Sequence, residues 1–486
     1  MGKKTIIIIP MYITQELLRT LPEHIVIQGD ENTRPFECDG LSVYRQKPLA
    51  VVLPENIDHV KQTLKICKKL NVPVVTRGAG TGLAGGAMPL ENSIVLGLSK
   101  LNKVKAIDPV TKTAVVEPGV RNIAISEAVS ELGLYYAPDP SSQIACTIGG
   151  NVAENSGGVH CLKYGLTVHN VVAVKILTID GEELILSRDD DGLGLLALMN
   201  GSEGLLGIII EVTVKLTDKP AQVQLVVAGY DSVRECANAV TNIIQAGIIP
   251  AGLEMMDKFA IEAAEDFAHA GYPKDAQALL LCELDGDDDA VKLELDKVLE
   301  ILSNSSSLTL AKNEQQRLSL WQGRKSAFPA VGRLSPDYYC MDGTIPRRYL
   351  ADVLEKIGEL SEFYGLRVAN VFHAGDGNLH PLILYDANKE GELEKTEKFG
   401  TDILKLCVDF GGSITGEHGV GIEKLDAMCH QFASDELEIF HQIKTVFDPK
   451  ALLNPGKAVP TLHRCAELGG MHVHNGELPH PELERF

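Results

Sequence analysis

The sequence predicts a two-domain α+β protein, in which a first domain of short strands is followed by a second domain of alternating strands and helices. Three observations predict this fold class. The chain has 486 residues, enough for two or three domains of roughly 100 to 200 residues each. A strand, helix, strand pattern and several short β-like runs occupy residues 50–216. Beyond Pro220, longer amphipathic helices alternate with strands.

The first domain is expected to span residues 46–218. Its strand, helix, strand unit consists of AVVLP, a stretch with apolar residues on one helical face, and VPVVT. Short strands are then predicted in IVLGL, KVKAID, TAVVEP and GIIIEVTVKL, and Asp180-Gly181 is typical of a hairpin turn. Residues 1–45 should pack on this domain, and the four isoleucines before Pro10 predict a buried or partner-facing strand.

The second domain is expected over residues 219–458. QLVVAGY and ALLLCEL predict strands, and the amphipathic stretches Val233–Ala246 and Val291–Leu302 predict helices. The remaining tail, 459–486, contains several histidines and either docks a partner subunit or makes no fixed contact.

Charge, hydropathy and cysteine spacing exclude several classes of protein. Asp plus Glu number 66 against 45 Lys plus Arg, and the formal charge of -21 would repel a nucleic acid backbone. The longest apolar runs are far shorter than the roughly 20 residues that span a bilayer. Ten cysteines occur without a C-x-x-C pair, which argues against a disulfide framework and an iron–sulfur cluster in this chain. We therefore expect a cytoplasmic protein with neither a membrane span nor a nucleic acid partner.

Three polar, glycine-rich segments in the first domain predict a dinucleotide site. RGAGTGLAGG begins at Arg77 directly after a strand, where glycine lets backbone amides approach a pyrophosphate. It contains G-x-G-x-x-G, but Gly86 and Pro89 prevent the helix that a nicotinamide-binding fold requires there. TIGGNVAENSGG starts at Thr147 and NGSEGLLG at Asn200, and both add backbone and amide groups. Each segment alone could be a structural turn, but three in one domain favour a long dinucleotide cofactor.

These motifs resemble the FAD-binding domain of the vanillyl-alcohol-oxidase superfamily, also called the PCMH-type domain. The likeness rests on R-G-x-G-T-G-x-x-G-G, I-G-G-N-x-x-x-N-x-G-G and S-E-G-x-L-G and covers residues 45–216. It implies noncovalent FAD, because the first segment offers no histidine for attachment. The resemblance implies that FAD is contacted by Arg77, Gly78, Ala79, Gly80, Thr81, Gly82, Thr147, Gly150, Asn151, Asn155, Gly158, Glu203 and Ile208.

In the second domain, VFHAGDGNLHPLILY favours a hairpin that brings two histidines together. With Asp376-Gly377 as a two-residue turn, His373 would lie directly opposite His380, with Cβ atoms about 5 Å apart. Two such imidazoles can chelate a metal, and Glu417 of GEHGVG could complete the site and leave positions for a substrate. His418 could then serve as general base. Isolated histidines are more often ordinary buried or surface residues, and GEHGVG could be a polar turn.

The C-terminal motifs resemble the FAD-linked dehydrogenases of D-lactate, D-2-hydroxyglutarate and glycolate. The resemblance implies an α+β FAD-linked oxidase C-terminal domain with His418 as the base. It also implies a divalent metal, Zn in preference to Mn or Fe, held by His373, His380 and Glu417.

The reaction implied by this resemblance oxidises a 2-hydroxy acid to the 2-oxo acid. Arg324, in WQGRKSAFPAVGR, would bind the substrate carboxylate through its planar guanidinium, with Lys325 and Arg333 as alternatives. His418 would remove the hydroxyl proton while a hydride passes to flavin N5.

Two positions and the cysteine pattern bear on substrate size and partners. The hydroxyglutarate enzymes have a lysine near the position of Cys340 and an asparagine in place of Leu382, so we expect a short acid here, glycolate or D-lactate. Electrons should pass to a quinone or to partners, and the resemblance implies iron–sulfur and second FAD-domain subunits of a glycolate dehydrogenase complex, which would bring the chain to the inner membrane. The alternatives are a D-lactate or D-2-hydroxyglutarate dehydrogenase acting alone and a catalytically silent FAD scaffold subunit.

Overall fold

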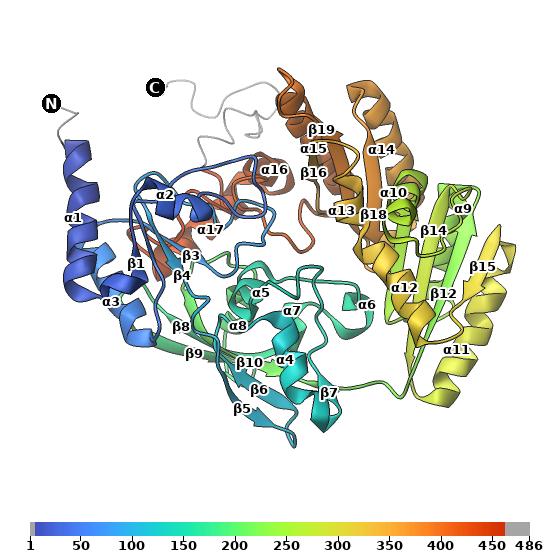
Figure 1. Cartoon of the computed structure of the whole chain (residues 1–486), viewed down its shortest axis with the longest axis horizontal. Coiled ribbons are helices and arrows are strands. Elements are labelled where there is room, and N and C mark those ends of the chain that lie inside the picture. Colours follow the sequence, from blue (N-terminus) through green and yellow to red (C-terminus); the bar gives the residue numbers. More distant parts are fainter. Residues whose placement is uncertain (1–4, 462–486) are drawn as a thin grey trace.

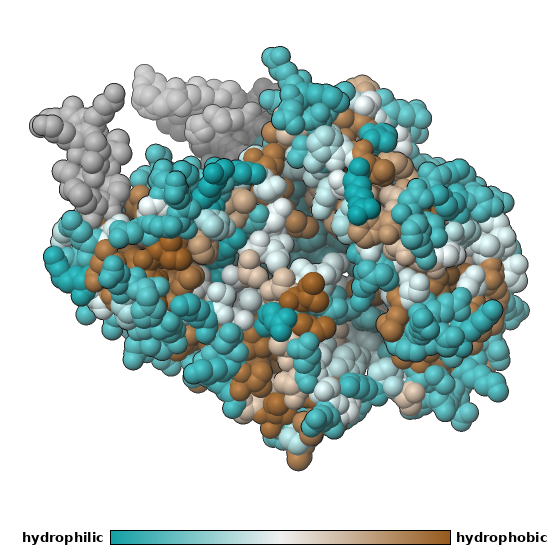
Figure 2. Space-filling view, in the orientation of Figure 1, coloured by the Kyte–Doolittle hydropathy of each residue, from teal (hydrophilic) through white to brown (hydrophobic). Residues whose placement is uncertain are grey.

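The computed structural model describes residues 5–461, with side chains from Tyr12 onward. A four-stranded and a five-stranded sheet form most of the first half, and an eight-stranded sheet forms the second (Figure 1), which confirms the α+β prediction. The surface seen in Figure 2 is mostly hydrophilic, with separate hydrophobic patches. Within residues 5–461, no helix combines the length and the hydropathy needed to cross a membrane. The histidines of the C-terminal tail lie outside the described residues, so neither expectation for this tail is tested.

The four-stranded sheet presents the first glycine segment. Its order is β1-β2-β4-β3, with β2, β4 and β3 parallel. α3 (Ile57–Leu70) connects β2 to β3. It forms a helix because its apolar residues have helical spacing and make one buried face, and because Asn56 caps its first turn. The glycine segment therefore leaves the carboxyl end of a buried strand. The strands are β1 (Val26–Ile27), β2 (Ala50–Val52), β3 (Val74–Arg77) and β4 (Ile94–Gly97).

The predicted N-terminal strand is wrong, because the isoleucines Ile6–Ile9 lie in α1 (Thr5–Thr20). The apolar pattern continues past Pro10 with helical spacing, and Ile13 and Leu17 are fully buried. α1 packs against α3. An amphipathic pattern that extends over four turns outweighs the strand preference of four β-branched residues.

The five-stranded sheet is antiparallel, with the order β5-β6-β10-β8-β9. α5 (Ile148–Glu154) packs on β10, so the second glycine segment, expected as a loop, is partly helical. Gly149 lets the start of α5 approach the turn after β6, since a Cβ there would lie 2.7 Å from Pro118 Cβ. The strands are β5 (Val104–Asp108), β6 (Thr113–Val116), β8 (Val171–Leu177), β9 (Glu183–Ser187) and β10 (Ile208–Lys215), and the short elements nearby are α4 (Asn122–Val129), β7 (Leu134–Tyr135), α6 (Cys161–Tyr164), α7 (Thr167–Asn170), α8 (Leu195–Met199) and β11 (Thr217–Asp218).

The eight-stranded sheet carries helices on both faces, so side chains of alternating residues enter two separate cores. Its order is β15-β12-β14-β13-β18-β19-β16, and β17 pairs with β19. The strands are β12 (Gln222–Tyr230), β13 (Gly252–Asp257), β14 (Ala278–Gly286), β15 (Ser307–Leu310), β16 (Asp337–Cys340), β17 (Gly343–Thr344), β18 (Val368–His373) and β19 (Asn378–Tyr385). One core contains residues of α9 (Val233–Gln245), α11 (Asp288–Ile301), α14 (Leu350–Tyr364) and α15 (Glu392–Asp409). The other contains residues of α10 (Lys258–Ala268), α12 (Glu314–Lys325) and α13 (Ala327–Val331).

After α16 (Leu425–Gln431) and α17 (Ser434–Phe447), the chain returns to the first domain. Leu453 bridges to Val74 of β3 and is fully buried. Asn454 Nδ2 then donates to the carbonyl oxygens of Gly86 and Glu203. The end of the second predicted domain therefore holds two glycine segments of the first domain in place.

Candidate active site

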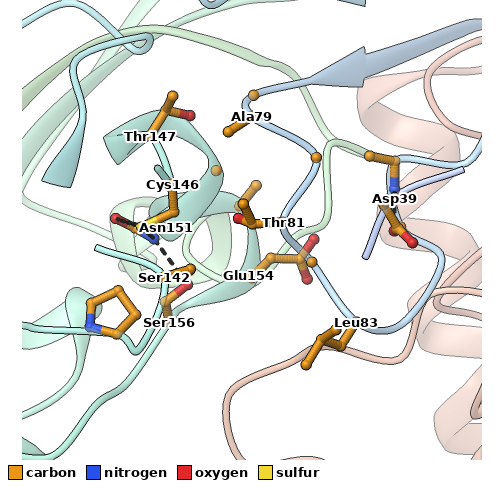
Figure 3. Close-up of a pocket in the computed structure, with 18 of the residues that line it drawn as sticks. Asp39, Ala79, Thr81, Leu83, Ser142, Cys146, Thr147, Asn151, Glu154 and Ser156 are labelled. Carbon is orange, nitrogen blue, oxygen red and sulfur yellow. Dashed lines mark hydrogen bonds between the residues drawn. The ribbon is translucent and has the colours of Figure 1, made fainter. Parts of the chain in front are cut away.

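A cavity of about 400 Å³ lies between the two domains (Figure 3). Its walls come from the first glycine segment, α5 and the loop before it, and the histidine-containing segments of the second domain. Most of the predicted FAD contacts line it, namely Gly78, Ala79, Gly80, Thr81, Gly82, Thr147, Gly150, Asn151 and Glu203. The three glycine segments therefore converge on one space.

The remaining predicted FAD contacts, Arg77, Asn155, Gly158 and Ile208, are not among the lining residues. Arg77 donates to the carbonyl oxygen of Cys38 in the N-terminal segment, and Asn155 accepts from Val168 N of its own domain, so both side chains hold loops in place. Ile208 is buried in the core, whereas its neighbour Ile209 lines the cavity.

The cavity lining fits a long polar cofactor. Three buried side-chain oxygens of residues that line it have no hydrogen-bond partner among the described residues, namely Thr76 Oγ1, Thr147 Oγ1 and Glu154 Oε2. The backbone at Gly78 approaches closely, since a Cβ there would lie 2.3 Å from Thr147 Oγ1. Unsatisfied polar atoms beside backbone that only glycine permits are what a bound dinucleotide requires.

The hairpin that carries the two histidines has a different register from the predicted one. The turn contains four residues, so His373 lies opposite Asn378, and His380 lies opposite Val371. The predicted direct pairing of the histidines is therefore wrong. Both nevertheless project to one face, because Val371 and His373 are two residues apart on β18. The imidazole centroids are 5.1 Å apart.

Glu417 joins the two histidines at the end of the cavity. Its Oε1 lies 3.3 Å from His373 Nε2 and 3.0 Å from His380 Nε2. Its Oε2 accepts a hydrogen bond from Gly157 N, at the end of the second glycine segment. One ligand atom from each of the three side chains falls within 4.8 Å of the others, which suits a single ion. The structure thus brings together all three predicted metal ligands.

An acceptor near Nδ1 orients each of the two imidazoles, His373 and His380. His373 Nδ1 lies 2.7 Å from Glu254 Oε1, and His380 Nδ1 lies 3.4 Å from the carbonyl oxygen of Met341. Acceptors at Nδ1 leave Nε2 available as the ligand atom. Burial disfavours the charged form of both His373 and Glu417, but their neighbours outweigh this effect. Glu254 and Glu417 raise the pKa of His373. The imidazoles of His373 and His380 lower the pKa of Glu417.

A second set of ligand atoms overlaps the first. Cys340 Sγ, His380 and His418 also lie within 4.8 Å of one another. Burial raises the pKa of the Cys340 thiol well above its usual range, and only a thiolate binds metal strongly. The site with Glu417, whose carboxylate is already ionised, is therefore the better one.

Asp342 holds the segment that carries Glu417 and His418. Its buried carboxylate accepts hydrogen bonds from the backbone N–H groups of residues 416–418, at 2.9 to 3.3 Å. Lys424 Nζ, also fully buried, lies 2.9 Å from Asp342 Oδ2. Burial alone would raise the pKa of Asp342, but Lys424 and the nearby imidazoles hold it well below its usual range.

Replacing Asp342 by asparagine should lower the free energy of unfolding by about 3 to 5 kcal/mol, because Lys424 would remain buried without its counterion. Comparing urea unfolding curves of this variant with the wild type measures the effect. Asp191→Asn, at an exposed position, is the control and should leave the curve unchanged. An Asp342→Asn protein as stable as the wild type would show that the ion pair does not hold this segment.

His418 lies beside the predicted metal ligands and lines the cavity. Its ring is stacked on His380, with centroids 5.0 Å apart, and its Nδ1 is buried without a partner. The pKa of His418 is lowered to about 4, chiefly by burial and also by the neighbouring His380, against the opposing effect of Asp342. The imidazole is therefore neutral at physiological pH and able to accept a proton.

Arg324 is placed behind the site rather than on the cavity wall. It is 3% exposed, and its guanidinium lies 2.6 Å from Glu254 Oε2. Its Nε has no hydrogen-bond partner in the part of the chain that the structure describes. Glu254 therefore links Arg324 to His373. The adjacent Lys325 lines the cavity, whereas Arg333 lies over the ring of Phe267.

Comparison with known proteins identifies the family. Residues 48–187 match the family described as FAD binding domain, and residues 219–458 match FAD linked oxidases, C-terminal domain. Glycolate oxidase subunit GlcD of Escherichia coli (strain K12) is 59% identical over 479 residues, which cover 97% of this chain and 96% of that protein. The chain belongs to the FAD-linked oxidases. Its cofactor is FAD, and it is an FAD-dependent oxidoreductase.

More distant relatives of this FAD-linked oxidase share its fold. D-lactate dehydrogenase of Anaerostipes hadrus is 31% identical, over 92% of this chain and 97% of that protein. The solved structure of p-cresol methylhydroxylase with substrate bound has a TM-score of 0.78 at 16% identity, covering 93% of this chain and 97% of that one. At that identity the likeness shows the fold alone.

Sequence reasoning missed two supporting carboxylates of this FAD-linked oxidase. Glu254 and Asp342 are both fully buried. A charged residue between apolar neighbours in LEMMD was the available signal for Glu254, because a buried strand accepts a carboxylate only with a partner. Asp342 follows a strand in CMDGT and gave no comparable signal.

Proposed function

We propose that this FAD-linked oxidase oxidises a short 2-hydroxy acid, with glycolate as the preferred substrate, to the 2-oxo acid. The observation that carries the proposal is the cluster of His373, His380, Glu417 and His418, of which the last three line the cavity assigned to FAD. The 59% identical relative is named a glycolate oxidase subunit, which supports the same substrate class.

Each residue of the site has a role in this proposal. When bound, a divalent metal, preferably Zn, would lower the pKa of the substrate hydroxyl. FAD would take up the hydride. His373, His380 and Glu417 would hold the metal. His418 accepts the hydroxyl proton, for which its neutral imidazole is suited. The hydroxy acid loses one hydride and one proton and becomes the oxo acid.

A cation at the site would bind the substrate carboxylate. Arg324 remains our proposal for this role, because its planar guanidinium matches a carboxylate and its Nε is unpartnered. The Nη2 atom of the Arg324 guanidinium already forms an ion pair with Glu254. Lys325, on the cavity wall, supplies positive charge to the same anion.

The residues beside His380 support a short substrate. Cys340 and Leu382 lie directly opposite each other in the β16–β19 pair, on the same face as His380, and both are buried in a hydrophobic core. A second carboxylate of a longer acid would find no polar partner at either position and would be desolvated at a cost in free energy. Glycolate and D-lactate carry no such group.

The experiment that tests the proposal is a substrate panel under anaerobic conditions. Glycolate or D-lactate should reduce the bound FAD with a kcat/KM at least about tenfold above that of D-2-hydroxyglutarate. Leu382→Asn should narrow this difference, and Leu382→Val, which adds no polar group, is the matched control. Preference for D-2-hydroxyglutarate would contradict the short substrate. Failure of all three acids to reduce FAD would contradict the proposed function.

The proposal extends to the electron acceptor. We propose that iron–sulfur and second FAD-domain subunits receive the electrons, and that the chain works in the cytoplasm and reaches the inner membrane only through them. The 59% identical relative is itself named a subunit, which supports partner proteins. Co-purification of tagged protein from its native cells tests this, with iron content of the complex as the readout.

A further inference from the structure

Glu283 is a buried carboxylate of the second domain that the proposed reaction does not use. It lies on β14, and its side chain is 4% exposed. Its Oε2 accepts hydrogen bonds from Trp321 Nε1 and, at 2.8 Å, from Arg317 Nη1, both on α12. Its Oε1 lies 3.1 Å from Nε2 of His160, at the start of α6 in the first domain (Figure 1). One carboxylate therefore joins α12 to the FAD-binding domain.

The link continues from His160 to the cavity wall of the first domain. His160 Nδ1 lies 2.9 Å from Asp139 Oδ2, and His160 N donates to Asp139 Oδ1. Asp139 directly precedes residues 140–142, which line the cavity. Burial disfavours a charge on His160, but Asp139 and Glu283 outweigh this effect and raise its pKa to about 10. An imidazolium between two carboxylates thus joins the two domains beside the cavity.

Glu254 and Glu283 project from the same face of the eight-stranded sheet. Glu254 lies on β13 two residues beyond Gly252, and Gly252 pairs with Glu283 of β14. Side chains two residues apart on a strand share a face, so the two carboxylates point in the same direction. A Cβ on Gly252 would lie 3.3 Å from Trp321 Cη2. The glycine opposite Glu283 therefore leaves room for the indole of Trp321.

α12 contacts this face through three residues. Arg317, Trp321 and Arg324 are separated by four and three positions, which places them on one side of the helix. Glu283 binds Arg317 and Trp321, and Glu254 binds Arg324. The two carboxylates together fix the position of α12 on the sheet. The helix ends at Lys325, which lines the cavity, so a shift of α12 would displace both of its C-terminal cations relative to the first domain.

We propose that Glu283 is a positioning residue for substrate binding, which fixes α12, and with it Arg324, relative to the FAD-binding domain. The proposal rests on the proposed function, in which Arg324 binds the substrate carboxylate. The hydroxy acid must contact Arg324 and the flavin at the same time, although these belong to different domains. Glu283 is the group that binds both the arginine helix and the first domain.

The test is anaerobic FAD reduction followed at increasing concentrations of glycolate. In Glu283→Gln, the half-saturating concentration should rise about tenfold, because a displaced Arg324 binds the carboxylate less well before and during hydride transfer alike. The maximal rate should change less than about threefold. The domains should stay joined in this variant, because Asp285 still binds Lys163 and Tyr164 of α6.

Glu314→Gln is the matched control. Glu314 pairs with Arg317 on the same helix, but its side chain is 65% exposed, and a surface ion pair contributes little. The half-saturating concentration of Glu314→Gln should equal that of the wild type.

A double-mutant cycle distinguishes positioning through Arg324 from a general loss of structure. Arg324→Lys keeps a cation beside Glu254 but lacks the planar fork, and should raise the half-saturating concentration about tenfold. Adding Glu283→Gln to this variant should change the value by less than about twofold. Independent effects of the two substitutions would multiply instead.

Three outcomes would overturn the proposal for Glu283 while leaving the role of Arg324 intact. These are a wild-type half-saturating concentration in Glu283→Gln, effects that multiply in the double variant, and a loss of FAD content and maximal rate alone, which marks a purely structural role. An unchanged value in Arg324→Lys would instead contradict the carboxylate-binding role of Arg324 in the proposed function, and with it the role of Glu283.

Arg317→Met replaces Glu283→Gln in the cycle if the glutamine variant does not fold. The Arg317 side chain is 19% exposed, and its loss leaves Glu283 bound to Trp321 and His160. The half-saturating concentration should rise in Arg317→Met and should not rise further when Arg324→Lys is already present. Effects that multiply in this second cycle would overturn the proposal.

Discussion

Replacing His418 by asparagine should slow the anaerobic reduction of FAD by glycolate about 10²- to 10⁴-fold, the usual contribution of a general base. The stacked ring of His380 and the hydrogen bond from His418 N to Asp342 fix its position beside the proposed metal ligands. Asparagine keeps the backbone contact and a polar side chain but cannot accept the proton. Stopped-flow absorbance of the flavin measures the rate.

Two controls make the His418 result specific. FAD content and metal content of His418→Asn should equal those of the wild type, because neither is assigned to this side chain. His430→Asn, at an exposed histidine paired with Asp409, should reduce FAD at the wild-type rate. An unchanged rate in His418→Asn would refute its role as base.

Replacing Glu417 by alanine should remove the bound metal and decrease the rate of FAD reduction by glycolate at least about 10³-fold, as expected when both metal and hydroxyl activation are lost. Glu417 supplies the only carboxylate of the three-residue set, and its Oε1 is the atom that faces both imidazoles. Elemental analysis of the purified variant measures the metal directly.

The matched control is Glu438→Ala, an exposed glutamate on α17, which should retain metal and activity. The Glu417 variant should still bind FAD, because within the described residues its carboxylate is hydrogen-bonded to the cofactor domain at a single group, Gly157 N. Full metal content in Glu417→Ala would mean that another set of residues, such as Cys340, His380 and His418, holds the ion.

The sequence was sufficient for the main features of the site because these depend on short-range patterns. The hairpin with His373 and His380 shows which error in a predicted register leaves the site intact. A turn of four residues instead of two changed every pairing, yet His373 and His380 stayed on one face, because the register moved by two residues and side chains alternate with a period of two. A shift of one residue would have separated them.

Features that depend on distant segments could not be predicted. Glu254 meets Arg324 and His373 only because β13 lies beside β18 and α12 packs below them. The helix α1 was mistaken for a strand because its apolar run at 6–9 has the composition of a strand, whereas the helical spacing became clear only with the buried Ile13 and Leu17. In both cases tertiary packing outweighed the local pattern.

The most direct test of the central claim is anaerobic FAD reduction by glycolate before and after removal of the metal by a chelator. Elemental analysis and FAD absorbance should be recorded on the same samples. We expect the chelated protein to keep its FAD, to lose reduction by glycolate, and to regain it when Zn²⁺ is returned. Rapid reduction by glycolate in protein shown to contain no metal would contradict a site built from His373, His380 and Glu417.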